Sequence, residues 1–340
     1  MDFYPLTITG VVDETARARS FRLSPAAGHA PLFAYKPGQF LTFRIPRGGG
    51  HVERCYSLSS APACDAELKV TVKRVADGFG SNWFNDVPKP GDTVEAAPPS
   101  GRFVLRSRER QPVLFAGGSG ITPVISLIKQ ALHETSLAPR LFYANTDVDQ
   151  IIFRRELDAL GARFPGRLEC HHHVDAQSGL ADAGSVRDFI GGRLDCDFFI
   201  CGPAPFMALT EDVLSGLGVG DRHVFIERFT MPEDGESDAD TEIAAGDSGV
   251  ESFRATLDGE EHEVPYRAGE TLLRCMLSQG LDAVYSCEDA HCGSCMVIRK
   301  SGEVAMRKST VLSKRDKERG YILLCQAVPR SADVWVDCDA

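Results

Sequence analysis

Four cysteines near the carboxyl end constrain this chain more than any other feature. Cys287, Cys292 and Cys295 follow a C-x₄-C-x₂-C spacing, and Cys325 comes later in the chain. Two irons bridged by two sulfides need four further soft ligands, which cysteine thiolates supply. Bringing three ligands together within so short a segment requires a tight backbone turn, which Gly293 permits. The spacing therefore predicts a [2Fe–2S] cluster.

A structural zinc site is the alternative interpretation, because it can also take four cysteines. Zinc sites usually pair their cysteines in two C-x₂-C knuckles, which differ from this asymmetric spacing. In a chain that looks cytosolic, eleven cysteines are expected to be metal ligands or free thiols more often than disulfides. The first residues, MDFYPLTITG, have neither the basic start nor the apolar stretch of a signal peptide. We therefore expect a cytoplasmic protein.

Composition also argues against two classes of partner. The sequence has no apolar run of the roughly 20 residues that a membrane span needs. Its formal net charge of −11 is unsuited to meeting the phosphates of nucleic acid. We therefore expect neither a membrane nor a nucleic acid as partner.

Residues 1–106 have the pattern of antiparallel strands. Segments 40–45 and 68–73 alternate with period two, as half-buried strands do. Glycine and proline interrupt the chain between such segments. This part of the chain is expected to form an antiparallel β-barrel or a sandwich.

The sequence pattern changes over residues 107–230. Apolar runs at 113–116, 141–144 and 198–201 are separated by segments long enough for helices. Short apolar runs that alternate with helical segments are typical of βαβ units and a parallel sheet. An α/β domain is therefore expected here.

An acidic stretch precedes the last part of the chain. Residues 231–249 hold seven acids and three glycines but neither lysine nor arginine, which is typical of a flexible linker. Residues 250–340 return to strand-like segments, with one helix expected at about 271–279. The sequence thus predicts a multidomain protein.

A glycine-rich turn follows the first apolar run of the α/β region. Residues 117–123 read GGSGITP, between a predicted strand and a predicted helix. Gly118 and Gly120 would let the backbone approach a pyrophosphate, and the helix start would offer free N–H groups. Thr122 is the expected N-cap and Pro123 the expected first helical residue. A bare structural turn is the alternative, but the position between strand and helix favours nucleotide binding.

Two more segments end predicted strands of the same sheet. Cys201, Gly202 and Pro203 follow the last apolar run, at a carboxyl strand end where ligands bind in open α/β sheets. By base rate, a cysteine there would more often fill the core. Asn145 and Asp147 follow the middle run, and an acid there accepts hydrogen bonds from ribose hydroxyls and repels a 2′-phosphate. NADH is therefore favoured over NADPH.

The predicted barrel carries a third motif at residues 54–57, which read RCYS. An arginine offers a fork for a phosphate, a tyrosine offers a flat face for a ring, and a serine can bond a ring nitrogen. Alternation along a strand would put Arg54 and Tyr56 on one side, with Ser60 a further candidate. Alone, the motif would indicate only a solvated strand. Its place before the glycine-rich turn and the four cysteines favours a cofactor site.

Together these motifs resemble the ferredoxin–NAD(P)⁺ reductase superfamily, and residues 250–340 resemble a plant-type ferredoxin. The stretches ERCYSLSS, TVKRVADGFGSNW, GSGITP, LFYAN and FICGPAPFM are most similar to the oxygenase reductases grouped with the reductase component of 3-ketosteroid 9α-hydroxylase. The resemblance covers essentially the whole chain. It implies an FAD-binding barrel at 1–106, an NAD-binding domain at 107–230 and a β-grasp ferredoxin domain at 250–340. One departure is Glu288-Asp289-Ala290, where ferredoxins often have Arg-x-Gly after the first ligand.

The resemblance also implies roles for single residues. Arg54 would hold the flavin phosphate, Tyr56 would stack on the isoalloxazine, and Ser57 would approach its N5. The other residues implied at the flavin are Cys55, Thr71, Val72, Lys73, Gly78, Gly80, Ser81, Asn82 and Phe229. Those implied at the nicotinamide nucleotide are Gly118, Gly120, Thr122, Asn145, Asp147, Cys201, Gly202 and Pro203. Ser57, Cys201 and Glu227 would lie nearest the reacting atoms.

The domain order follows from redox chemistry. Nicotinamide gives up two electrons as a hydride, a [2Fe–2S] cluster accepts one at a time, and a flavin can do both. The implied path runs from NADH through FAD and the cluster to a terminal oxygenase, of the Rieske type in the leading interpretation. FMN is the alternative flavin, because FMN reductases of the phthalate dioxygenase type share the domain order.

Two other functions remain open on the sequence alone. The chain could serve a di-iron oxygenase such as a phenylacetyl-CoA epoxidase, whose reductases have the same layout. It could also be a redox carrier or sensor with a vestigial nicotinamide site. A basic run between the third and fourth ligands is either a solvated face or a docking patch for an acidic partner. That run comprises Arg307, Lys308, Lys314, Arg315, Lys317 and Arg319.

Overall fold

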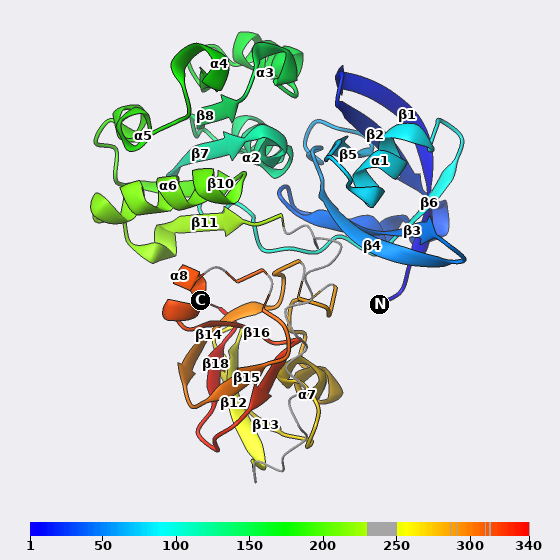
Figure 1. The fold of residues 1–340 in the computed structure, drawn as a ribbon, viewed down its shortest axis with the longest axis vertical. Helices are drawn as coiled ribbons and strands as arrows, with labels where there is room; N and C mark the ends of the chain where they lie inside the picture. Colours follow the sequence, from blue (N-terminus) through cyan, green and yellow to red (C-terminus); the bar gives the residue numbers. More distant parts are fainter. Residues whose placement is uncertain (230–249, 286, 291, 310, 313, 340) are drawn as a thin grey trace. The chain divides into compact units, whose positions relative to one another are not determined.

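The computed structural model describes residues 1–229, 250–285, 287–290, 292–309, 311–312 and 314–339. These residues form two units, Met1–Glu227 and Arg228–Ala340 (Figure 1). The predicted linker at 231–249 lies outside the described residues, as does the side chain of Lys314. Across the described ranges, no helix is both long and apolar enough to span a membrane.

The first unit begins with an antiparallel sheet of six strands (Figure 1). Its order is β4-β3-β6-β1-β2-β5, and an antiparallel bridge between Leu58 and Val70 joins its two edges. The predicted barrel is therefore confirmed. Its elements are β1 (Tyr4–Thr15), β2 (Ala18–Pro25), η1 (Ala27–Phe33), β3 (Phe40–Arg47), β4 (Gly50–Ser57), β5 (Leu68–Lys73), α1 (Phe79–Asp86) and β6 (Thr93–Ala96).

Alternation along the strands builds the core of the barrel. In β5, Leu68, Val70 and Val72 are buried in this core. Strand geometry turns the residues between them to the opposite face. Helix α1 adds Phe84, whose ring centroid lies 5.3, 5.1 and 5.1 Å from those of Phe21, Phe43 and Tyr56. One aromatic cluster thus supports both the barrel wall and a residue of the RCYS motif.

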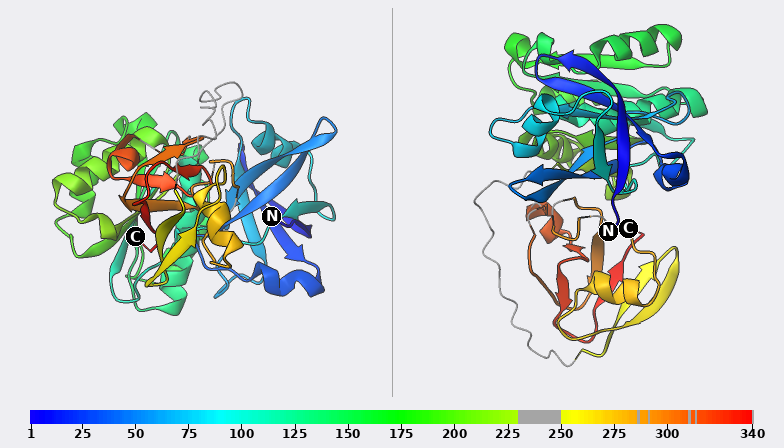
Figure 2. Two further views of the ribbon diagram at one scale, coloured as in Figure 1. Left: turned by 90° about the horizontal axis from the view of Figure 1, so that it is seen from below. Right: turned by 90° about the vertical axis from the view of Figure 1, so that its right-hand side faces the viewer.

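A parallel sheet of five strands follows, in the order β11-β10-β7-β8-β9 (Figures 1 and 2). This is the α/β architecture that the sequence predicts. Its strands are β7 (Gln111–Gly117), β8 (Arg140–Asn145), β9 (Glu169–Val174), β10 (Cys196–Cys201) and β11 (Val224–Glu227). Its helical segments are η2 (Gly118–Gly120), α2 (Ile121–Glu134), η3 (Val148–Gln150), α3 (Arg154–Arg163), α4 (Asp175–Ser178), α5 (Ala183–Ile190), α6 (Ala204–Gly216) and η4 (Asp221–His223).

Helices cover both faces of this sheet, so its central strands β7 and β10 are buried on both sides. In β10, Phe199 and Cys201 pack in the cluster that includes the apolar residues of α2 and α3. Phe198 and Ile200 pack in the opposite cluster, with α5 and α6. The two-residue period of the strand therefore turns Cys201 toward α2.

One local prediction is wrong. Thr122 is not an N-cap and Pro123 is not the first helical residue, because α2 already begins at Ile121 and its N-cap is Gly120. The preceding residues form the short 3₁₀ turn η2, and Gly120 itself has helical angles, φ −60° and ψ −10°. The Thr122 hydroxyl donates to the Ser119 carbonyl at 3.1 Å instead of capping the helix.

The second unit has a mixed five-stranded sheet in the order β13-β12-β18-β14-β16, with β15 and β17 paired beside it. Helix α7 packs Leu272, Leu273 and Met276 into the core of this unit, which confirms the helix expected at 271–279. The helix itself is drawn in gold in Figure 2. The elements are β12 (Ser252–Leu257), β13 (Glu260–Pro265), α7 (Leu272–Ser278), β14 (Met296–Ser301), β15 (Val304–Met306), α8 (Lys314–Glu318), β16 (Tyr321–Leu323), β17 (Ala327–Pro329) and β18 (Trp335–Asp337).

Replacing Phe84 with alanine should destabilise the barrel by about 3–5 kcal/mol, because the substitution leaves a cavity at the centre of the aromatic cluster. Urea unfolding followed by Trp83 fluorescence, in a Trp335→Phe background, measures the change. Val87→Ala is the matched control, since Val87 is 57% exposed just after the same helix and should cost within about 0.5 kcal/mol. Equal unfolding midpoints for the two variants would contradict the prediction.

Candidate functional site

Strand β4 and the start of α1 form one cradle. A Cβ on Gly80 would stand 2.9 Å from Arg54 Cγ and 3.1 Å from the Tyr56 hydroxyl. Arg54 and Tyr56 therefore share the face of β4 that looks onto this turn, as strand alternation predicts. Cys55 lies between them in sequence and contacts Thr42 instead, with its Sγ 3.4 Å from the threonine Oγ1. A Cβ at position 80 would therefore require the Arg54 side chain to shift.

Ser57 ends β4 beside this cradle. Its side chain is buried, at 3% exposure, and its Oγ has no hydrogen-bond partner among the described residues. A buried hydroxyl without a partner costs about 1–3 kcal/mol. Such an atom fits a site whose missing partner is a ligand, and a flavin ring nitrogen is the partner that the motif predicts. The residues present therefore fit a flavin.

The turn at residues 78–82 is held by its own side chains. Ser81 Oγ accepts from the Val75 amide and donates to the Gly78 carbonyl, both at 3.1 Å. Asn82 Nδ2 donates to the Val75 carbonyl at 3.3 Å. Ser81 and Asn82 therefore shape the turn, and its backbone at the start of α1 is what could meet a phosphate.

The three β5 residues that the sequence assigns to the flavin divide between two faces. Val72 packs in the barrel core, so only its backbone could contact a cofactor. Thr71 Oγ1 lies 2.8 Å from Ser20 Oγ and 2.9 Å from Ser59 Oγ. Lys73 reaches toward the glycine-rich turn, its Nζ 3.4 Å from where a Cβ on Gly118 would stand. Burial, together with the nearby Arg17, lowers the pKa of Lys73.

The glycine-rich turn and the CGP segment touch through their backbones. A Cβ on Gly120 would stand 2.1 Å from the Cys201 carbonyl oxygen, and one on Gly202 would stand 2.9 Å from the Gly117 nitrogen. A Cβ on Gly117 would meet the Pro203 ring at 2.6 Å. Two segments far apart in the sequence thus meet where only glycine fits. Gly117 was not among the residues assigned to the site from the sequence, although the two consecutive glycines at 117–118 could have indicated it.

The remaining nucleotide-site residues lie at the carboxyl ends of neighbouring strands. In register, Cys201 pairs with Ala116 on one side and with Glu227 on the other. Cys201 is fully buried, and this burial, with a smaller effect of Glu227, raises the pKa of its thiol. Asn145 ends β8, and its side chain is buried. These positions form one edge of the sheet, as parallel strands require.

Asp147 and Phe229 are exposed members of the predicted site, as is Pro203. Asp147 caps the short turn η3, where its carboxylate accepts from the Asp149 amide at 3.3 Å. Phe229 follows β11 and is 40% exposed. Both side chains are therefore accessible to a ligand.

Backbone amides of the cysteine loop point at the cysteine sulfurs. The Cys292 and Asp289 amides donate to Cys287 Sγ at 3.3 and 3.5 Å. The Cys287 and Ser294 amides donate to Cys292 Sγ, both at 3.5 Å. Such donors stabilise thiolates that bind a metal cluster. The donor set therefore fits the predicted [2Fe–2S] cluster.

The four thiols pair with one another across this site. A hydrogen bond from Cys287 lowers the pKa of Cys292 to about 6 and raises that of Cys287. A hydrogen bond from Cys295 likewise lowers the pKa of Cys325 and raises that of Cys295. Each pair thus favours one thiolate, which is the form that binds metal.

Gln326 was not identified from the sequence, yet it touches this site twice. Its buried side-chain amide donates to Cys325 Sγ at 3.6 Å and to the Glu288 carbonyl at 2.9 Å. Only its position next to a predicted ligand could have drawn attention to it. Gln326 thereby joins the fourth cysteine to the loop that carries the other three.

The loop also accommodates its departure from the Arg-x-Gly pattern. Glu288 and Ala290 adopt left-handed backbone angles, φ +53° and +59°, which glycine would adopt more easily. Glu288 pairs with Arg274 at 2.6 Å, and Asp289 pairs with Lys308 at 2.8 Å. The carboxylates of Glu288 and Asp289 are therefore each paired with a basic side chain. Lys308 belongs to the predicted basic run, so part of that run is engaged within the unit.

Comparison with known proteins agrees with this geometry. The chain matches three domain families: the oxidoreductase FAD-binding domain over residues 6–105, the oxidoreductase NAD-binding domain over 114–212, and the 2Fe-2S iron-sulfur cluster binding domain over 255–330. FAD, NAD and a [2Fe–2S] cluster are therefore the cofactors of this chain.

Relatives of known function align along the whole chain. The ferredoxin reductase component of 3-ketosteroid-9-alpha-monooxygenase from Mycolicibacterium smegmatis is 42% identical over 98% of this chain and 96% of its own. One component of the 1,2-phenylacetyl-CoA epoxidase from Escherichia coli is 30% identical over 99% and 98%. The solved structure of phthalate dioxygenase reductase, 27% identical, covers 98% of each chain with a TM-score of 0.62.

Gly120→Ala should destabilise the first unit by about 1–3 kcal/mol, because its Cβ would overlap the backbone of residue 201. The affinity of this variant for NAD⁺, measured by calorimetric titration, should also be lower than that of the wild type. Gly161→Ala in α3 is the control: nothing lies within 4 Å of its Cβ position, so it should be neutral or stabilise by about 0.4–1 kcal/mol. Wild-type stability and NAD⁺ binding in Gly120→Ala would count against the close approach.

Gln326→Leu should make the cluster harder to reduce, because it removes a donor that stabilises the extra negative charge of the reduced state. One hydrogen bond is worth about 0.5–1.5 kcal/mol, or about 20–60 mV for one electron. A redox titration followed by electron paramagnetic resonance measures the midpoint potential. Gln279→Leu, at an exposed position after α7, should leave it unchanged. An unshifted potential in Gln326→Leu would refute this role.

Proposed function

The chain belongs to the family of oxygenase reductases that join FAD-, NAD- and [2Fe–2S]-binding domains, and we propose that it carries electrons from NADH to a terminal hydroxylase of the Rieske type. When bound, the flavin accepts a hydride and releases electrons singly, so a two-electron donor can serve a one-electron acceptor. Along the chain we assign an FAD domain to residues 1–106, an NAD domain to 107–230, a linker to 231–249 and a ferredoxin domain to 250–340.

The observation that carries the proposal is the approach of barrel strand β5 to the glycine-rich turn. Lys73 of β5 reaches to within 3.4 Å of the Cβ position of Gly118. Transfer of a hydride requires donor and acceptor rings in contact, so a flavin motif and a nucleotide motif must share one cleft. Their proximity within one unit supports a shared site.

We assign each residue the task that its position suits. Arg54 and the backbone of Gly78 and Gly80 bind flavin phosphates, and Tyr56 presents its ring to the flavin. Ser57 offers its unpartnered hydroxyl to the flavin N5 edge. Gly117, Gly120 and Gly202 let the backbone approach the nucleotide. Cys201 and Glu227, on paired strand ends, bound the nicotinamide pocket and exclude water from it.

The cluster site has its own division of tasks. Cys287, Cys292, Cys295 and Cys325 are the proposed ligands. The amides of Cys287, Asp289, Cys292 and Ser294, with the side chain of Gln326, hydrogen-bond the sulfurs and set how readily the site accepts an electron.

The proposed electron acceptor is chosen on sequence similarity to the relatives. The ketosteroid monooxygenase component is 42% identical and the epoxidase component 30%, which favours a hydroxylase over a di-iron oxygenase. We propose the cytoplasm as the place of action, because many cysteines, four of them proposed ligands, suit a reducing compartment.

An absorbance spectrum of the anaerobically purified protein, before and after one equivalent of NADH, tests the function. We expect flavin bands with a broad iron–sulfur shoulder, and both should bleach on NADH. Bands that dithionite bleaches but NADH does not would favour a carrier with a vestigial nucleotide site. Zinc on elemental analysis and no shoulder would overturn the electron exit through the four cysteines.

Asp147→Ser should shift cofactor preference from NADH toward NADPH, because it removes a negative charge that repels the 2′-phosphate. We expect the ratio of kcat/KM for NADH to that for NADPH to fall by about tenfold, equivalent to about 1.4 kcal/mol. Asp158→Ser, an exposed aspartate on α3 of the same region, is the control and should leave the ratio unchanged. An unchanged ratio in Asp147→Ser would exclude this residue from the ribose site.

A further inference from the structure

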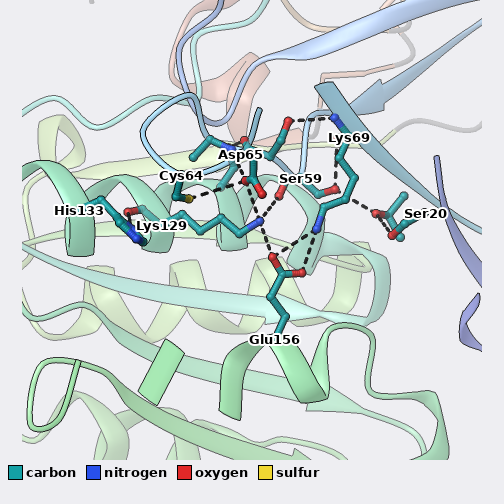
Figure 3. A network of polar contacts seen from close by, with 12 residues as sticks. Ser20, Ser59, Cys64, Asp65, Lys69, Lys129, His133 and Glu156 are labelled. Carbon is teal, nitrogen blue, oxygen red and sulfur yellow. Dashed lines mark hydrogen bonds and ion pairs between the residues drawn. The ribbon is translucent and has the colours of Figure 1, made fainter. Parts of the chain in front are cut away.

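A buried lysine joins the barrel to the parallel sheet within the first unit. Lys129, on α2, is only 2% exposed. Its Nζ donates to the Ser59 carbonyl and to Asp65 Oδ2, both at 3.0 Å, and forms an ion pair with Glu156 (Figure 3). Burial lowers the pKa of Lys129, but Glu156 and Asp65 outweigh that effect and raise it, so the side chain is charged.

Two ion pairs cross between the barrel and the parallel-sheet domain of this unit, and their charges run in opposite directions. Lys69 of β5 donates to both oxygens of Glu156 in α3, at 3.2 and 2.9 Å (Figure 3). Lys129 of α2 pairs with Asp65 in the loop before β5. Each half therefore supplies one acid and one base to the other. The barrel and the sheet are thus joined by two ion pairs, Lys69 with Glu156 and Lys129 with Asp65.

A second contact lies one helical turn earlier on α2. Ser126 Oγ donates to the Ser60 carbonyl at 2.6 Å and accepts from the Gly38 amide at 3.2 Å. Residues three apart share one face of a helix, so Ser126 and Lys129 fasten the same face of α2 to the same barrel segment. Two adjacent attachments oppose rotation of the helix better than one would.

These attachments lie directly between the two proposed cofactor motifs. Ser59 and Ser60 follow Ser57, the last residue of β4. Helix α2 begins at Ile121, immediately after the glycine-rich turn. With a rise of about 1.5 Å per residue, Lys129 lies about 12 Å along α2 from its start. A tilt of about 5° at the attachment would therefore displace the glycine-rich turn by about 1 Å.

Such a displacement matters more for chemistry than for folding. Buried ion pairs add little net stability, because desolvation opposes the attraction between the charges, but they can specify one arrangement. A misplacement of about 1 Å can cost about 100-fold in rate when the reacting groups must be aligned. An arrangement of charges between the two halves is thus suited to setting geometry.

We propose that Lys129 is a positioning residue for hydride transfer: its contacts with Ser59, Asp65 and Glu156 set the angle between the nucleotide-binding helix and the flavin-binding strand. This inference rests on the proposed function, because it presupposes that the two motifs bind flavin and nicotinamide. Lys129 acts through the helix it belongs to, and its partners Ser59, Asp65 and Glu156 all lie outside the RCYS motif and the glycine-rich turn.

Lys129→Met tests the proposal in the full-length holoprotein. This variant keeps most of the side-chain length, and the acids retain other partners: Lys69 for Glu156 and the Ala61 amide for Asp65 at 2.8 Å. Lys89→Met, at an exposed barrel position, is the matched control. Four quantities are measured: FAD content, thermal midpoint, the rate of flavin reduction at saturating NADH, and the long-wavelength absorbance from nicotinamide stacked on flavin.

We expect the reduction rate of Lys129→Met to fall about 10- to 100-fold, with weaker long-wavelength absorbance and normal FAD content. Lys89→Met should match the wild type. Asp65→Asn should slow the reaction as well, and the double variant should be no slower than Lys129→Met alone, because Asp65 acts through its contact with Lys129. Lys129→Arg should recover part of the rate.

Two outcomes would overturn the proposal. One is a lowered thermal midpoint with wild-type rate and absorbance per bound FAD, which would make Lys129 merely structural. The other is additive losses in the double variant. If Lys129→Met does not fold, Glu156→Gln, which keeps the pair between Lys129 and Asp65, is used with the same criteria. Failure of NADH to reduce the wild-type flavin would instead refute the proposed function.

Discussion

The backbone contact between the glycine-rich turn and the CGP segment is the constraint on which the first unit depends. Gly117, Gly120 and Gly202 bring β7, β10 and α2 so close that a Cβ at any of them would overlap a neighbour. Parallel strands put these turns at one edge, and helices on both faces leave that edge as the open side of the sheet.

The barrel must then be held against that edge, and apolar packing alone does not specify an angle. Lys129, Lys69, Asp65 and Glu156 alternate in charge across the junction, and Ser126 adds a hydrogen bond to the barrel segment. Directional contacts of this kind specify one arrangement where a hydrophobic surface would tolerate several. The unit therefore combines a close backbone approach beside the proposed nucleotide site with a polar junction between the barrel and the sheet.

In the second unit the main constraint is the backbone conformation of the short loop that carries the cysteines. Gly293 adopts φ +67°, and Glu288 and Ala290 adopt similar angles without being glycine. Their strain is offset by contacts outside the loop: Arg274 pairs with Glu288, and Gln326 donates to the Glu288 carbonyl. The amides consequently point inward at the sulfurs, where they favour thiolates.

The sequence by itself determined the features that depend on local pattern. Period-two alternation predicted β5, and cysteine spacing predicted a [2Fe–2S] cluster, because each signal lies in short stretches of sequence. Tertiary structure decided the rest. The 3₁₀ turn η2 moved the cap of α2 from Thr122 to Gly120, and strand register turned Val72 into the core. Lys129 is buried although lysine is usually exposed, because its partners come from segments far away in the sequence. Local sterics and periodicity can be read along a chain, whereas a partner that neutralises a buried charge exists only once the chain has folded.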